Sequence, residues 1–347
     1  MLRQRSGGAM PQQIVSDAIR RQVDRAGVAE TGREAQISEG LMLGAALDYE
    51  NVLQARLGSA TFTVLHLVGH GMLVTFDRAR GWKLESSFPF PVILLRESTS
   101  ASPDASQHLL EAFASADRAS FASSFARSAI QQAPHWKESS QRGFNIRVTS
   151  STIHPAAAEK LAAWGIAQNI SSAWLGHLTG AAACESLGVP VVPYGETRAL
   201  GNFTYAFSER LVAQNVRLPT DEDIDLRVQV TLRNVARDIK YRSQLQRWEA
   251  MRQVVLDMRV LDDRDDEVVA FRTGYQDDLP DALAQQGDNT PARDAHFFDM
   301  AIYRCLQTLF SGIAKSDDAL LAKVFVKPDA RMRQQIDLFR KKYSRAA

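Results

Sequence analysis

The sequence predicts an α+β protein made of two α/β units, each an antiparallel hairpin-based sheet packed with amphipathic helices. The first observation is strict alternation, with apolar residues at every even position from Ile224 to Leu232. A period of two places one face of a strand on a core and the other in water. The second observation is a hairpin downstream, in which a strand ends near Asp262, an acidic turn follows, and an apolar strand returns at Val268. The third is an echo of this plan around Asp77, which predicts two related units.

The composition is that of an ordinary globular protein. Of the 347 residues, 45% are hydrophobic and 23% are charged, and 41 basic residues against 40 acidic ones give a net charge of +1. This length makes two domains the default expectation. The balanced charge creates no overall field that would attract nucleic acid, so a nucleic-acid partner is not expected. The chain also lacks the run of about 18 apolar residues that a transmembrane helix needs.

Composition shifts along the chain give the expected boundaries. Residues 1–11 are polar and are predicted to be disordered, residues 12–150 to form a first α/β domain, residues 151–320 a second, and residues 321–347 a C-terminal helix and basic tail. The N-terminus has no apolar stretch typical of a signal peptide. The expected location is therefore the periplasm if a signal has been removed, and otherwise the cytoplasm.

The first domain is expected to combine helices with one long hairpin. Residues 37–57 are apolar and compatible with a helix, although two glycines weaken it. Residues 61–76 are rich in β-branched and aromatic side chains, and residues 81–95 return as a second strand. Residues 102–104, Ser-Pro-Asp, supply a capping hydroxyl and a proline for the start of a helix.

The second domain begins with helices and short strands. Pro155 opens a helical region that ends at Gly188, and residues 189–194 form a short strand with two prolines, typical of a sheet edge. After the alternating strand and its hairpin, Pro291 begins a helix whose apolar residues recur every three or four positions.

One pair of segments suggests catalysis. His66-Leu67-Val68-Gly69-His70-Gly71 ends an apolar strand, and Ala183-Cys184-Glu185-Ser186 follows later in the chain. These segments resemble the histidine and cysteine motifs of caspase-like and CHAT-type cysteine peptidases. The resemblance implies that His70 would activate Cys184, since an imidazole helps to generate a thiolate at neutral pH. The alternative is that Cys184 and Cys305 are buried free thiols on apolar helix faces. The sequence leaves open whether these two cysteines form a disulfide.

Metal and cofactor sites are not expected from the spacing of the residues. On a strand that rises ~3.3 Å per residue, His66 and His70 would share a face but lie about 13 Å apart, which is too far for one ion. The acidic turn over residues 262–267 lacks the glycine of a calcium loop. No glycine-rich phosphate motif is present. The remaining histidines show no ligand spacing: His108, His135, His154, His177 and His296.

The downstream hairpin carries a second resemblance. Its strand Val255 to Asp262, polar turn and return strand Glu267 to Phe271 resemble a recurrent piece of TolB N-terminal-like and curli-secretion-channel-like domains of bacterial envelope proteins. The resemblance covers about residues 155–315. It implies a non-catalytic α/β module that assembles with other envelope proteins.

These observations favour a protein that acts by binding a protein partner, as an accessory component of a bacterial envelope or secretion complex. The alternatives are the cysteine peptidase and a cytoplasmic ligand-binding protein. The sequence leaves the oligomeric state open. The expected contact surface is the polar row between the alternating apolar residues: Asp225, Arg227, Gln229, Thr231 and Arg233.

Overall fold

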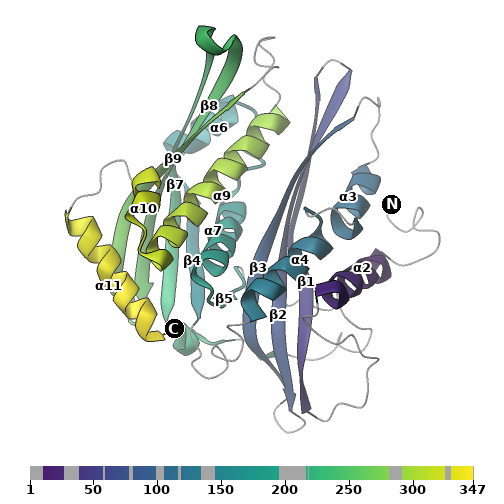
Figure 1. The fold of residues 1–347 in the computed structure, drawn as a ribbon, viewed down its shortest axis with the longest axis vertical. Helices are drawn as coiled ribbons and strands as arrows, with labels where there is room; N and C mark the ends of the chain where they lie inside the picture. Colours follow the sequence, from purple (N-terminus) through teal and green to yellow (C-terminus); the bar gives the residue numbers. More distant parts are fainter. Residues whose placement is uncertain are drawn as a thin grey trace.

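The structure is a computed structural model, and it confirms the α+β class with helices packed on two sheets (Figure 1). Among the residues it describes, no helix is both long enough and apolar enough to cross a bilayer. The predicted disordered segment falls almost entirely outside the described residues, as do the Ser-Pro-Asp helix start and the turn after Asp77. The described ranges are 11–26, 39–57, 59–77, 81–98, 105–115, 119–133, 145–194, 216–217, 219–280, 291–324 and 330–346.

Three long antiparallel strands make up most of the first sheet. β1 (Glu39–Leu57), β2 (Ala60–Asp77) and β3 (Gly81–Ser98) pair in chain order, and the short β6 (Val216–Arg217) runs parallel to β3 at the edge. The helix expected over residues 37–57 is wrong, because most of this segment is β1. A register shift at Asp48 interrupts the alternation of β1, and pairing along the whole of β2 satisfies its backbone.

The second sheet is mixed and has the order β5-β4-β7-β8-β9. β7 (Leu226–Arg242), β8 (Arg247–Asp262) and β9 (Glu267–Pro280) form an antiparallel meander, whereas β4 (Ile146–Ile153) runs parallel to both β7 and β5 (Val191–Val192). The domain boundary predicted at residue 150 falls inside β4. The predicted alternation is confirmed, because these residues are buried: Ile224, Leu226, Val228, Val230 and Leu232.

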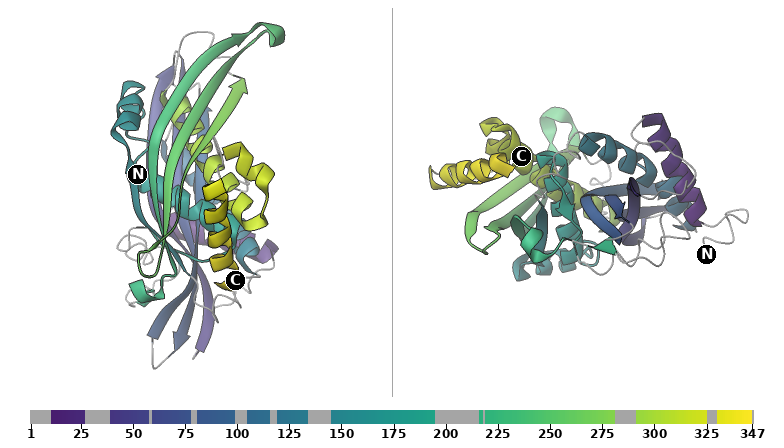
Figure 2. Two further views of the ribbon diagram at one scale, coloured as in Figure 1. Left: turned by 90° about the vertical axis from the view of Figure 1, so that its left-hand side faces the viewer. Right: turned by 90° about the horizontal axis from the view of Figure 1, so that it is seen from below.

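Helices lie on both sides of the first sheet. α3 (Ala105–Ala114) and α4 (Phe121–Gln132) contact one face of β2 and β3, and α2 (Pro11–Ala26) packs on these two helices. α7 (Ser172–Leu187) and α9 (Pro291–Lys315) lie between the two sheets and contact both (Figures 1 and 2). The layers therefore run helix, sheet, helix, sheet, and one cluster of buried side chains spans both halves of the chain.

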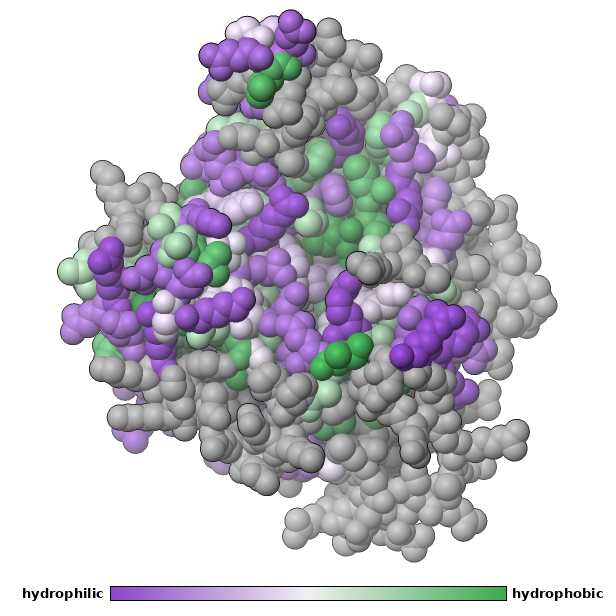
Figure 3. Space-filling view, in the orientation of Figure 1, coloured by the Kyte–Doolittle hydropathy of each residue, from purple (hydrophilic) through white to green (hydrophobic). Residues whose placement is uncertain are grey.

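Three further helices complete the second half. α10 (Asp318–Val324) and α11 (Ala330–Ala346) pack against α9 and β9, while α6 (Pro155–Ala163) contacts β7. The side of the molecule that carries α9, α10 and α11 is mainly hydrophilic in its described part (Figure 3). The left view of Figure 2 shows these three helices on one side of β7, β8 and β9. The opposite face of that sheet bears the polar row of β7.

The glycines of the His66–Gly71 segment have a packing role. Gly69 pairs across the sheet with Phe90, and Gly71 pairs with Phe88. A Cβ atom added at Gly71 would lie 2.0 Å from ring carbons of Phe88, so the ring occupies the space above the glycine. An aromatic ring laid over a cross-strand glycine covers backbone that the glycine would leave bare. Odd positions of β2 thus face α4, and even positions face α7 and α9.

We predict that Gly71→Ala lowers the free energy of unfolding by about 1–3 kcal/mol, because the added methyl group must displace the Phe88 ring in a packed core. Gly180→Ala is the matched control. Its Cβ would lie 3.3 Å from Val191 Cγ1, a tight contact that a shift of a few tenths of an ångström would relieve, and alanine favours a helix interior such as α7. Urea unfolding of both variants measures the difference. Equal stability of the two variants would contradict the packing role of Gly71.

Candidate functional site

A group of buried polar side chains lies where the first sheet meets α7 and α9. β2 directs His66 and His70 toward these helices, since both occupy even positions of the strand. Each is only 1% exposed. Each also lies beside a buried aspartate, His70 beside Asp48 and His66 beside Asp299. The interior of the protein therefore holds two carboxylate–imidazole groups.

Asp48 reaches the first group because of a β-bulge. In the pairing of β1 with β2, Leu47 is opposite Gly69 and Tyr49 is opposite Val68, so Asp48 has no partner in the ladder. An extra residue of this kind bends a strand and redirects side chains. The Asp48 carboxylate lies against His70, and the neighbouring Tyr49 ring packs near Trp174 and His177 of α7.

The first group joins three elements, β1, β2 and α7. Asp48 Oδ2 lies 3.1 Å from His70 Nε2 and 3.4 Å from His177 Nδ1. His70 Nδ1 lies 3.2 Å from Ser87 Oγ on β3. Burial lowers the pKa of His177 to about 4, against the opposing influence of the Asp48 charge, so this imidazole is neutral at pH 7. The group thus places a carboxyl group and two imidazoles together in the buried interior.

The second group joins β2 to α7 and α9. Trp174 Nε1 donates to Asp299 Oδ1 at 2.7 Å, and His66 Nε2 lies 2.6 Å from Asp299 Oδ2. The His66 ring also stacks on the Trp174 ring, with centroids 4.6 Å apart and planes 8° apart. These contacts attach both helices to the inner face of the first sheet.

The two residues of the peptidase alternative lie in different surroundings. His70 belongs to the group with Asp48 and His177, whereas Cys184 lies two turns beyond His177 on α7. Cys184 is buried, and burial together with the charge of Glu185 raises the pKa of its thiol. A nucleophilic cysteine needs the opposite shift. Both cysteines, Cys184 and Cys305, are buried free thiols.

The polar row predicted on β7 divides into residues with internal contacts and residues that face outward. Asp225 Oδ2 accepts a hydrogen bond from the Asn145 backbone, and Arg227 Nη1 donates to the Asp262 carbonyl in the β8–β9 turn. The Arg227 side chain is only 14% exposed. Thr231 bonds the Thr152 hydroxyl on β4. Arg233 is 42% exposed, and Gln229 is half-buried on the same face.

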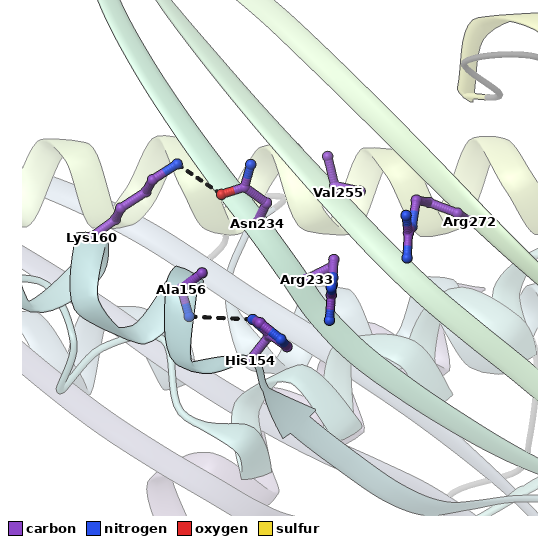
Figure 4. A pocket seen from close by; sticks show the side chains of 7 residues that line it. All are labelled: His154, Ala156, Lys160, Arg233, Asn234, Val255 and Arg272. Carbon is purple, nitrogen blue, oxygen red and sulfur yellow. Dashed lines mark hydrogen bonds between the residues drawn. The ribbon is translucent and has the colours of Figure 1, made fainter.

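Arg233 lies at the edge of a hollow on the open face of the second sheet. A register shift between Leu232 and Asn234 leaves Arg233 without a partner on β8, a second case in which a bulge redirects a side chain. The hollow measures about 440 Å³, and Figure 4 shows Arg233 of β7 and Arg272 of β9 pointing to the same side, with β8 between their strands. Its lining residues are His154, Ala156, Lys160, Arg233, Asn234, Val255 and Arg272.

The hollow is cationic. Arg272 donates to both oxygens of Asp257, at 2.6 and 3.1 Å, and Arg233 lies 3.9 Å from the same carboxylate. Lys160 Nζ donates to two uncharged oxygens, the side-chain oxygen of Asn234 and the carbonyl of Val235. His154 Nδ1 accepts from the Ala156 backbone at the start of α6, which leaves its Nε2 as the donor. The hollow therefore holds three cationic side chains, and two of them, Arg233 and Arg272, lie beside one carboxylate.

Comparison with known proteins gives no family for this chain. No protein-family profile matches it, and no curated protein is similar enough to count as a relative. The likeness of the β8–β9 hairpin to envelope-protein domains therefore stays a prediction.

The sequence did not indicate either group as a site. Asp48, His70 and His177 come from three separate elements, so no local spacing connects them. One sequence pattern could have indicated these groups. His66, Val68 and His70 alternate along β2, which places both imidazoles on one buried face. A buried histidine needs a polar partner, and that partner lies elsewhere in the chain.

We predict that Asp299→Ala lowers the free energy of unfolding by on the order of 3 kcal/mol, because it leaves Trp174 Nε1 without its buried acceptor and removes the carboxylate beside His66. Asp299→Asn keeps an oxygen for Trp174 and should cost clearly less. Thermal and urea unfolding measure both changes. Asp337→Ala, at an exposed acid on α11, is the control and should change stability little. The interpretation fails if Asp299→Ala behaves like this control.

We predict that Cys184 does not react with an alkylating probe at pH 7 in the folded protein and reacts after denaturation, because burial keeps its thiol protonated and covered. Mass spectrometry of labelled peptides reads the site directly. Rapid labelling of Cys184 in the native state would contradict this prediction and support the peptidase hypothesis.

Proposed function

We propose that this chain is a non-catalytic binding module that holds an acidic segment of a protein partner on the open face of its second sheet. The observation that supports this most directly is the cationic hollow around Arg233 and Arg272. Guanidinium groups form forked, charge-assisted hydrogen bonds with carboxylates. A partner carboxylate would therefore find two guanidiniums that share a single internal counter-ion, Asp257.

The surroundings of the hollow support the same proposal. His154 directs its Nε2–H away from the α6 backbone, and the Lys160 ammonium adds positive charge beside Asn234. The polar face continues along β8 and β9 through the ion pair of Arg259 with Glu267. A face of charged and hydroxyl side chains suits a polar, hydrated contact rather than an apolar one. Gln229 and Arg233 are the residues of the predicted row that remain suited to partner contact.

The partner is proposed to belong to a bacterial envelope or secretion complex, with this chain as an accessory component. The support for this finer statement is the sequence likeness of the β8–β9 hairpin to envelope-protein domains. Fractionation of native cells tests it separately from the charge argument. Recovery of the protein in the envelope fraction, cross-linked to an envelope protein, is expected. Recovery only in complexes of cytoplasmic proteins would contradict it.

We predict that the double variant Arg233→Glu/Arg272→Glu weakens partner binding at least ~10-fold, because it removes two charge-assisted contacts and adds repulsion. The tagged full chain is first cross-linked in its native cells, and the protein recovered with it is purified. Dissociation constants of wild type and variant for that protein are then measured at two salt concentrations. Wild-type affinity should fall as salt rises.

Arg259→Glu is the matched control. Arg259 lies on the same face, is 57% exposed and pairs with Glu267, outside the hollow. Its reversal should leave the dissociation constant within about twofold, since isolated exposed pairs contribute little. If the double variant binds as wild type does, or if the control weakens binding equally, the hollow is not the contact site.

A further inference from the structure

We propose that Asp48, His70 and His177 form a binding site for one divalent transition-metal ion of the zinc type, inside the protein between the first sheet and α7. The site is independent of the outer hollow. Each residue offers one ligand atom, and the three atoms all lie within 4.8 Å of one another. Two imidazoles and one carboxylate form a donor set that suits transition metals.

The separations fit a shared ion. Two ligands of a tetrahedral ion, each ~2.0–2.1 Å from it, lie about 3.3–3.5 Å apart. Asp48 Oδ2 lies 3.1 Å from His70 Nε2 and 3.4 Å from His177 Nδ1. Both nitrogen–oxygen distances are therefore already close to those of ligands on one ion.

The orientation of the groups suits a shared ion. Although both distances are short, neither oxygen of Asp48 accepts a hydrogen bond among the described residues, and His70 Nε2 and His177 Nδ1 have no hydrogen-bond partner there. A hydrogen bond requires the N–H to point at the oxygen. In a metal site the nitrogen and oxygen lone pairs point instead at a third position, the ion.

The burial of these three side chains favours a bound cation. The side chains of Asp48 and His70 are each 1% exposed, and that of His177 is 5% exposed. A buried carboxylate without hydrogen bonds or a counter-charge is unfavourable by several kcal/mol. A divalent cation would supply the missing charge and would occupy the unpaired lone pairs.

The surroundings supply the support that metal ligands need. His70 Nδ1 lies 3.2 Å from Ser87 Oγ, a contact that fixes the ring and leaves Nε2 toward Asp48. The bulge at Asp48 holds the carboxylate in place, and the Tyr49 and Tyr194 rings pack beside His177. The ion would tie β1 and β2 to α7, and the three protein ligands would leave a fourth coordination position open.

The full chain, stripped with a chelator and dialysed, tests the proposal. Titration with Zn²⁺ should show about one ion bound per chain by elemental analysis, and the melting temperature should rise with Zn²⁺ concentration. Mg²⁺ and Ca²⁺ should produce neither effect, because they prefer all-oxygen sites. Co²⁺ should give a visible absorption spectrum typical of nitrogen and oxygen ligation.

Variants show whether these residues hold the ion. Asp48→Asn and His177→Gln should each abolish stoichiometric binding and the rise in melting temperature, whereas His154→Gln, at a histidine of the outer hollow, should retain both. Absence of Zn²⁺ binding and of any thermal shift in the wild type would overturn the proposal. Full binding by both ligand variants would overturn it as well. If a variant fails to fold, the wild-type stoichiometry and Co²⁺ spectrum still decide the question.

Discussion

The two sheets are held together by buried carboxylates on a single helix, α9. Asp294, in its first turn, forms ion pairs with Arg252 and Arg237 of the second sheet, and Arg252 contacts it through two nitrogens. Asp299, further along the same helix, meets Trp174 of α7 and His66 of the first sheet. Charges buried in this way are stable only when each has its partner, so the helix layer and both sheets must come together in one arrangement.

This constraint explains why the middle layer carries so much polar chemistry. α7 is buried around nearly its whole circumference, as expected for a helix between two sheets. Its polar side chains must therefore find partners inside the protein. Thr179 bonds the carbonyl of Leu175, Trp174 bonds Asp299, and His177 faces Asp48. Among the described residues, the short contacts of Asp48 with His70 and His177 are not directed hydrogen bonds.

The sequence predicts a strand correctly where one face of that strand is buried and the other is not. The alternation from Ile224 to Leu232 indicated a half-buried strand, and the structure confirms that these residues are buried. β1 was mistaken for a helix because the bulge at Asp48 shifts its alternation by one position. The same bulge brings Asp48 to His70. The local irregularity that obscured the strand is thus the feature that builds the candidate site.

The open face of the second sheet also shows what alternation alone cannot predict. The row from Asp225 to Arg233 was predicted as one surface, since alternation gives the face but not the neighbours. Pairing with β4 and β8 engages Asp225, Arg227 and Thr231 in internal contacts. Arg272, which completes the cationic hollow, is on a strand that the row could not indicate. Which charges remain for a partner therefore depends on strand order.

The most direct test of the account is to locate a metal ion in crystals of the full chain grown with Zn²⁺. Anomalous scattering measured at the zinc absorption edge identifies the ion independently of its surroundings. The account predicts one strong peak enclosed by Asp48 Oδ, His70 Nε2 and His177 Nδ1, each within about 2.2 Å of the ion. A structure in which these side chains hydrogen-bond one another or water, with no anomalous peak between them, would contradict it.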